Sequence, residues 1–179
     1  MRKQNPHFLQ AAAFLVLAAS AALAQAPAPA AQPWTPLQFL VGTWEGVGSG
    51  APGEGRGGCT FAFELNQKIL VRKNWAEYAP KPGEVQGVSH QDLMIIYAEP
   101  GEPRLKAIYF DMESHVIHYV LQTLAQPNRA VFESEPGTKG PHFRLSYEMN
   151  ADGRVLNIFS MAMPGQDFKE YTRGRLVKK

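Results

Sequence analysis

The stretch FLVGTWEGVGSGAPGEG, residues 39–55, holds the signal that decides the fold. Gly48, Gly50 and Gly53 fit G-x-G-x-x-G, a spacing that can cradle a pyrophosphate when a helix opens at the third glycine. The residues that follow, 53–58, are rich in glycine, and no helix grows through such a sequence. No βαβ pattern follows either. We therefore interpret these glycines as a flexible hairpin loop and not as a phosphate site.

The chain after this stretch alternates short apolar–polar runs with turn residues. No window shows a sustained apolar period of 3.6 residues, which argues against helices. Short connections make strands that are neighbours in sequence antiparallel, and closure removes the exposed edges of the sheet. We therefore predict an all-β fold, a closed antiparallel up-and-down barrel of about ten strands, after a short helical turn at 37–40. The expected strands are 41–48, 58–65, 68–78, 90–98, 104–111, 114–123, 129–135, 142–149, 154–163 and 167–177.

The N-terminal segment has the features of a secretory signal peptide. Residues 1–24 begin with basic residues, continue with the apolar run 8–23 and end on Ala-Leu-Ala, a pattern that signal peptidase recognises. The apolar run is about 16 residues, shorter than the ~20 of a membrane-spanning helix, so we favour a signal peptide over an anchor. We expect a periplasmic or secreted protein without an integral membrane segment after cleavage. Residues 25–36 then form a Pro/Ala-rich linker, and 37–179 form the barrel domain.

The charge and the cysteine content of the chain limit the classes of function that it can have. Without Arg2 and Lys3, the chain has equal numbers of basic and acidic residues, so no nucleic-acid partner is expected. Cys59 is the only cysteine, which excludes an internal disulfide. Its neighbours Thr60 and Phe61 favour a small buried side chain in a strand, the alternative being a reactive thiol.

Gly42-Thr43-Trp44 follows the expected helical turn and starts a strand, and it resembles the first-strand motif of lipocalins and related calycins. In those families the tryptophan closes one end of the barrel, and an arginine from the last strand packs across it. Arg173 and Arg175 are the candidates for this arginine. A guanidinium over an indole gains cation–π energy, so a structural role is favoured over ligand binding for these arginines.

Three segments, LVGTWEG (40–46), YFDMESHVIHY (109–119) and DFKEYTRGRL (167–176), resemble exported bacterial lipocalin-like proteins of uncharacterised function. Those proteins are similar in fold to the nitrobindins, ten-stranded barrels that bind haem. The resemblance implies a barrel with one internal pocket. Nitrobindins bind the iron through a histidine at the start of the last strand, and residues 166–169 contain none.

The histidines of the central segment do not predict a metal site. His115 and His118 are three residues apart, which places them on opposite faces of a strand, so they cannot chelate one metal together. His118 shares its face with Val116 and Val120, which indicates an apolar, inward position. If haem binds, His118 is the expected ligand; otherwise no cofactor is expected.

No catalytic motif is recognisable, so the sequence favours a binding protein over an enzyme without excluding an enzyme. The expected function is binding of a small apolar or amphipathic molecule inside the barrel. The alternatives are a haem-binding or enzymatic barrel of nitrobindin type and a protein-interaction module with a filled core. Residues 155–162 are apolar on both faces, which also suggests a homodimer contact. The candidate ligand-binding residues are Trp44, Trp75, Tyr109, His118, Tyr171 and Arg173.

Tyr171 and Arg173 share one strand face, and such a pair can grip a carboxylate. Intracellular fatty-acid-binding barrels look similar in this respect, although they carry the two residues in the opposite order.

Overall fold

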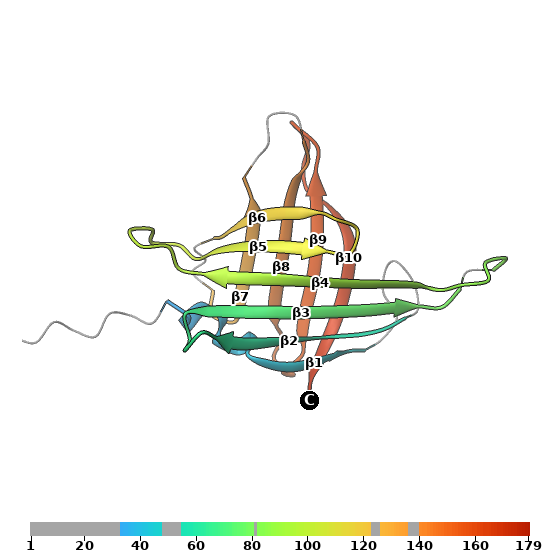
Figure 1. Ribbon diagram of the computed structural model, residues 1–179, viewed down its shortest axis with the longest axis horizontal. Coiled ribbons are helices and arrows are strands. Elements are labelled where there is room, and N and C mark those ends of the chain that lie inside the picture. Colours follow the sequence, from blue (N-terminus) through green and yellow to red (C-terminus); the bar gives the residue numbers. More distant parts are fainter. Residues whose placement is uncertain (1–32, 48–54, 81, 123–125, 136–139) are drawn as a thin grey trace, which may run out of the picture. The chain divides into compact units, whose positions relative to one another are not determined.

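The computed structural model describes residues 33–47, 55–80, 82–122, 126–135 and 140–179. A 3-10 helix, η1, precedes ten strands that form one closed barrel (Figure 1). The elements are η1 (Thr35–Leu40), β1 (Gly42–Gly46), β2 (Gly55–Glu64), β3 (Ile69–Tyr78), β4 (Val88–Tyr97), β5 (Lys106–Asp111), β6 (Val116–Leu121), β7 (Arg129–Ser134), β8 (His142–Met149), β9 (Val155–Ala162) and β10 (Lys169–Lys178).

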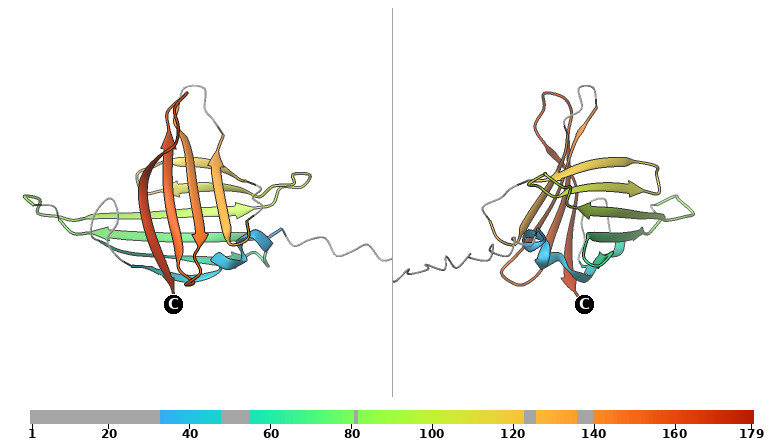
Figure 2. Two further views of the ribbon diagram at one scale, coloured as in Figure 1. Left: turned by 180° about the vertical axis from the view of Figure 1, so that it is seen from behind. Right: turned by 60° about the vertical axis from the view of Figure 1, so that its left-hand side comes forward.

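Each strand pairs antiparallel with its neighbour in the sequence, and β1 pairs with β10 to close the sheet. Figure 2 shows β7–β10 as a second wall whose strands cross the direction of β2–β6. The prediction of a closed up-and-down barrel of ten strands after a short helical turn is confirmed.

Three sequence-based interpretations fall on residues that the structure does not describe. They are the signal peptide, most of the linker and the loop with the three spaced glycines, within 1–32 and 48–54. Among the described residues, no helix has the length and apolar character needed to cross a membrane.

The helix η1 packs against one end of the barrel. Leu37 and Leu40 are completely buried in the core cluster together with Trp44, which is 2% exposed. The indole Nε1 of Trp44 donates a hydrogen bond of 2.7 Å to the carbonyl oxygen of Leu40. This bond satisfies a carbonyl at the end of η1 and ties the short helix to the first strand.

The cation over Trp44 comes from a different residue than the sequence suggested. The register of β1 and β10 pairs Trp44 with Lys178, whose Nζ lies 5.5 Å from the centre of the indole ring. Arg173 instead pairs with Glu170, with Nη2 2.6 Å from Oε2. The expectation that Arg173 or Arg175 packs across Trp44 is therefore wrong.

β6 begins at Val116, two residues later than predicted. The carboxylate of Asp111 accepts hydrogen bonds from the backbone N–H groups of Glu113 (3.1 Å) and His115 (2.8 Å). Ser114 adopts a positive φ of 70° between them. An aspartate side chain that accepts hydrogen bonds from the backbone N–H groups after it forms a turn in place of strand pairing. The connection between β5 and β6 is therefore longer than the sequence predicted.

Candidate functional site

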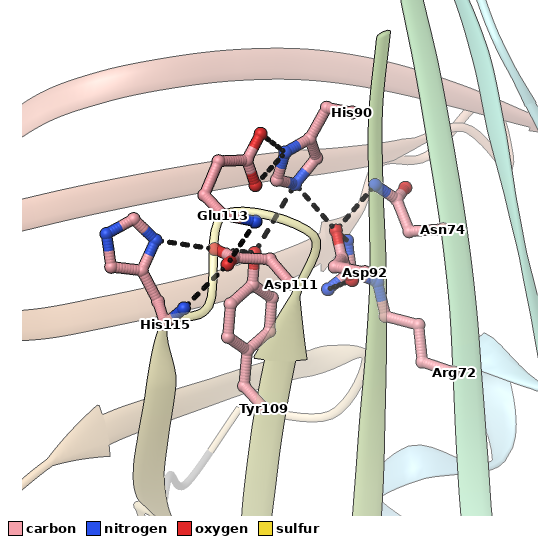
Figure 3. A network of polar contacts seen from close by, with 8 residues as sticks. All are labelled: Arg72, Asn74, His90, Asp92, Tyr109, Asp111, Glu113 and His115. Carbon is pink, nitrogen blue, oxygen red and sulfur yellow. Dashed lines mark hydrogen bonds and ion pairs between the residues drawn. The ribbon is translucent and has the colours of Figure 1, made fainter.

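β3, β4, β5 and the turn after β5 carry a connected set of polar side chains, which we call the polar network (Figure 3). The strand register brings its members together, because Asn74 pairs with Asp92 and Asp92 pairs with Asp111. Directly opposite residues share a face of the sheet. The members are Arg72, Asn74, His90, Asp92, Tyr109, Asp111, Glu113 and His115.

The buried end of the network is an ion pair inside the barrel. Arg72 Nη1 lies 3.1 Å from Asp92 Oδ1, and the two side chains are only 6% and 3% exposed. Asn74 Nδ2 donates a hydrogen bond of 2.8 Å to the other oxygen of Asp92. Burial opposes the charge of Arg72, but the Asp92 carboxylate beside it favours the charged form, so the pKa of Arg72 lies above its ordinary value. The guanidinium therefore stays charged within the core.

His90 connects this ion pair to the turn after β5. Its Nε2 lies 3.3 Å from Asp92 Oδ2, and its Nδ1 lies 3.0 Å from Glu113 Oε2. The hydrogen bonds to Asp92 and Glu113 raise the pKa of His90 to about 9, although burial opposes the charge. At neutral pH the imidazole is therefore protonated and donates from both nitrogens.

Tyr109 continues the network toward solvent. Its hydroxyl lies 3.4 Å from His90 Nε2 and donates to Asp111 Oδ2 at 3.4 Å. Asp111 is also 2.8 Å from Nδ1 of His115. Burial opposes the charge of Asp111, but the hydrogen bonds from His115 outweigh burial and lower its pKa. Because His115 is exposed, the network runs without a break from the core to the surface.

Two buried donor atoms beside the ion pair have neither a hydrogen-bond partner nor an ion-pair partner among the described residues. They are Nε of Arg72 and the hydroxyl of Tyr147, a fully buried residue of β8. The guanidinium carbon of Arg72 lies 5.9 Å from the centre of the Tyr147 ring. Burial raises the pKa of Tyr147, so its hydroxyl keeps its proton. A buried donor without an acceptor costs about 1–3 kcal/mol, and such groups in native proteins often mark a site of function.

Apolar side chains lie on β8, β9 and β10. The rings of Phe143 and Phe159 stack with centres 5.9 Å apart, and Tyr171 meets Phe159 edge-on at 6.1 Å. We call these three residues the aromatic wall. Phe143 and Phe159 pack against the core yet are only partly buried, as are Tyr109 and Ile117. This part of the barrel is therefore both apolar and accessible to solvent.

Of the residues predicted from the sequence, two lie at this site. Tyr109 belongs to the polar network, and Tyr171, 66% exposed, belongs to the aromatic wall. Trp44 lies in the core at the end covered by η1.

The other predicted residues lie on the outer face. Trp75 is 41% exposed and lines a hollow of about 450 Å³ with Thr60 and Lys73, and Trp44, Cys59 and Asn74 also border this hollow. His118 is exposed, because the alternate residues Tyr119 and Leu121 of β6 turn into the core. The expectation that His118 points inward is therefore wrong. Arg173 is held by its ion pair with Glu170.

Sequence reasoning missed the centre of the site. Arg72 follows Leu70 by two residues, and Asp92 precedes Met94 by two, so each charge falls on the buried face of its strand. The sequence signal for these residues was a charged side chain two positions from an apolar residue, on the same face of its strand.

Among the described residues, one group places its donor atoms close enough to hold a metal ion. Asp111, Glu113 and His115 offer ligand atoms within 4.8 Å of one another. These atoms already pair with each other and with His90, and two of the three residues are exposed, so we assign them no metal. His90, the inward histidine of the network, is likewise held by Asp92 and Glu113 and is not placed to bind haem iron.

No protein-family model matches this sequence, and no curated protein matches it either.

Proposed function

We propose that this protein is an exported, lipocalin-like barrel that binds a small amphipathic molecule between the polar network and the aromatic wall. The observation that carries the proposal is the buried ion pair of Arg72 and Asp92, flanked by the unpartnered donors of Arg72 and Tyr147. The core cluster consists of hydrophobic side chains, and Arg72 and Asp92 are buried charged residues outside it.

The energetics of the ion pair support a binding role. Replacing a buried ion pair by apolar side chains of similar size is often neutral or stabilises a protein by about 1–4 kcal/mol. A barrel that needed only stability would therefore be expected to fill this position with apolar residues. Retaining Arg72 and Asp92 in the core, with donors left over, fits a site whose polar groups serve a ligand.

The arrangement also fits the shape of an amphipathic ligand. Small-molecule sites combine a mainly apolar lining with a few polar groups that fix orientation. Here Phe143, Phe159 and Tyr171 supply the apolar surface, while Arg72 and Tyr147 supply the polar groups.

A fluorescence titration tests this proposal. Prodan is a naphthalene ketone whose emission shifts to the blue when it leaves water, and its carbonyl can accept a hydrogen bond from the site. We expect the purified protein to shift prodan emission in a saturable way. The double variant Arg72→Met/Asp92→Leu removes the ion pair without leaving a lone charge, so it should keep its circular dichroism spectrum and bind prodan at least about tenfold more weakly.

Two control variants fix the place of binding. Arg173→Met/Glu170→Leu removes an ion pair of the same kind from the outer surface and should leave prodan binding unchanged. Trp75→Ala removes an exposed side chain from the outer face of β3 and should also leave prodan binding unchanged. If Trp75→Ala abolishes binding while the double core variant retains it, the ligand binds outside the barrel and the proposal is wrong. If wild-type protein does not shift prodan at all, the filled-core interaction module becomes the better explanation.

A further inference from the structure

The cations inside the barrel are already matched by carboxylates. The guanidinium of Arg72 has Asp92 at 3.1 Å, and the imidazole of His90 lies between Asp92 and Glu113. Asp111 lies next in the network, on the far side of the Tyr109 hydroxyl. The site therefore offers no unmatched positive charge that an anionic ligand could neutralise.

What the site does offer is hydrogen-bond donors. Nε of Arg72 and the hydroxyl of Tyr147 are buried and have no nitrogen or oxygen acceptor among the residues described, and the Cys59 thiol beside the guanidinium is a weak acceptor. Arg72 can only donate, because a guanidinium has no acceptor atom. The missing complement is an acceptor oxygen on the ligand.

An anionic oxygen would bind poorly in this place. It would lose its hydration on entering the barrel, and a charged group without a matching cation is costly to bury. It would also approach Asp92, whose carboxylate is itself 3% exposed and close to the same guanidinium. An uncharged carbonyl, amide or hydroxyl oxygen avoids both the loss of ionic hydration and the repulsion.

We infer that the ligand presents an uncharged acceptor oxygen to Arg72 and Tyr147, and that the site discriminates against carboxylates. The ligand class is then a neutral amphiphile such as an amide, ester, ketone or alcohol, with its apolar part against the aromatic wall. This inference rests on the proposed function. It also differs from the carboxylate grip expected of Tyr171 and Arg173, since Arg173 lies in an exposed ion pair with Glu170.

Competition between two matched amphiphiles tests the inference in the wild-type protein. Decanamide and decanoate have the same chain length and differ in the charge of the head group at pH 8. We expect decanamide to displace prodan with at least about tenfold higher affinity than decanoate. A decanoate affinity equal to or above that of decanamide would overturn the inference while leaving the proposed function intact. If prodan does not bind inside the barrel at all, it is the proposed function that fails.

Changing one charge should cancel the preference for decanamide. Asp92→Asn keeps the shape of the side chain and leaves the charge of Arg72 unmatched, so decanoate should gain at least about tenfold over decanamide. The control Asp152→Asn changes an exposed aspartate in the turn between β8 and β9 and should leave the preference as in wild type. An unchanged preference in folded Asp92→Asn protein contradicts the inference.

A second variant tests the donor itself, and it does not disturb the ion pair. Tyr147→Phe removes a hydroxyl that has no partner, so the protein should fold normally. We expect decanamide to bind about fivefold more weakly to this variant, the usual effect of one uncharged hydrogen bond. Unchanged decanamide affinity would remove Tyr147 from the site and refute its assigned role.

Discussion

Raising the pH should destabilise this protein through His90. The groups that face its imidazole are Asp92 on β4, Glu113 in the turn after β5, and Tyr109 with Asp111 on β5. Contacts with the carboxylates raise its pKa from 6.5 to about 9. A folded-state pKa above the unfolded value stabilises the folded protein fully below about pH 6.5, and this stabilisation is lost as the pH rises through 9.

The size of the effect follows from the same values. A rise from 6.5 to about 9 corresponds to about 3 kcal/mol of unfolding free energy. Solvent around the imidazole, whose side chain is 29% exposed, screens these contacts and reduces the expected loss to about 2 kcal/mol.

Urea unfolding followed by circular dichroism at a series of pH values between about 6 and 10 measures this loss. The variant His90→Gln keeps a hydrogen-bonding side chain but cannot gain a proton. The difference between the wild-type and variant curves therefore isolates His90 from the Cys59 thiol, which ionises in the unfolded chain at the upper end of this range. The reasoning is refuted if the two curves run parallel, or if wild-type stability rises with pH where His90→Gln stability does not.

Three further predictions concern single side chains. Tyr147→Phe should raise the free energy of unfolding by about 1 kcal/mol, because it removes a buried hydroxyl without a partner; a loss of stability in urea unfolding would contradict this. Lys178→Ala should lower the free energy of unfolding by about 0.5 kcal/mol, because it removes the cation over Trp44. Arg173→Ala breaks an exposed ion pair and should leave the urea midpoint unchanged. Cys59 is buried and its pKa is raised by burial, so Ellman's reagent at pH 8 should modify it only after unfolding; rapid modification of native protein would show an accessible thiol.

The fold followed from the sequence because each strand carries its own signals. Alternation of apolar and polar side chains and turn residues between the runs determine where strands form, and short connections determine that neighbours are antiparallel. The turn after β5 departed from this pattern because the side chain of Asp111 competes for backbone N–H groups that a strand would otherwise use.

The orientation of individual strands was harder to predict. β6 is apolar in both phases, since Val116 and Val120 alternate with Ile117 and Leu121. Local alternation therefore could not decide whether His118 faces inward, and the pairing of β6 with β5 and β7 decides it.

The candidate site could not be predicted from the sequence for a related reason. Charged residues are normally exposed, so Arg72 and Asp92 were not expected in the core. They become partners only through the register of β3 and β4, which brings Asn74 opposite Asp92. The identity of the cation over Trp44 likewise depends on the register of β1 and β10.

The closure of the barrel has a consequence for how the chain folds. The sheet is sealed by pairing β1 with β10, the first strand with the last, so sealing depends on contacts between the most distant parts of the domain. Proteins dominated by such non-local contacts fold slowly. Until β1 and β10 meet, each presents a row of unpaired backbone groups that another chain can join. A slow pairing of β1 with β10 therefore lengthens the time for which each newly made molecule is exposed to aggregation.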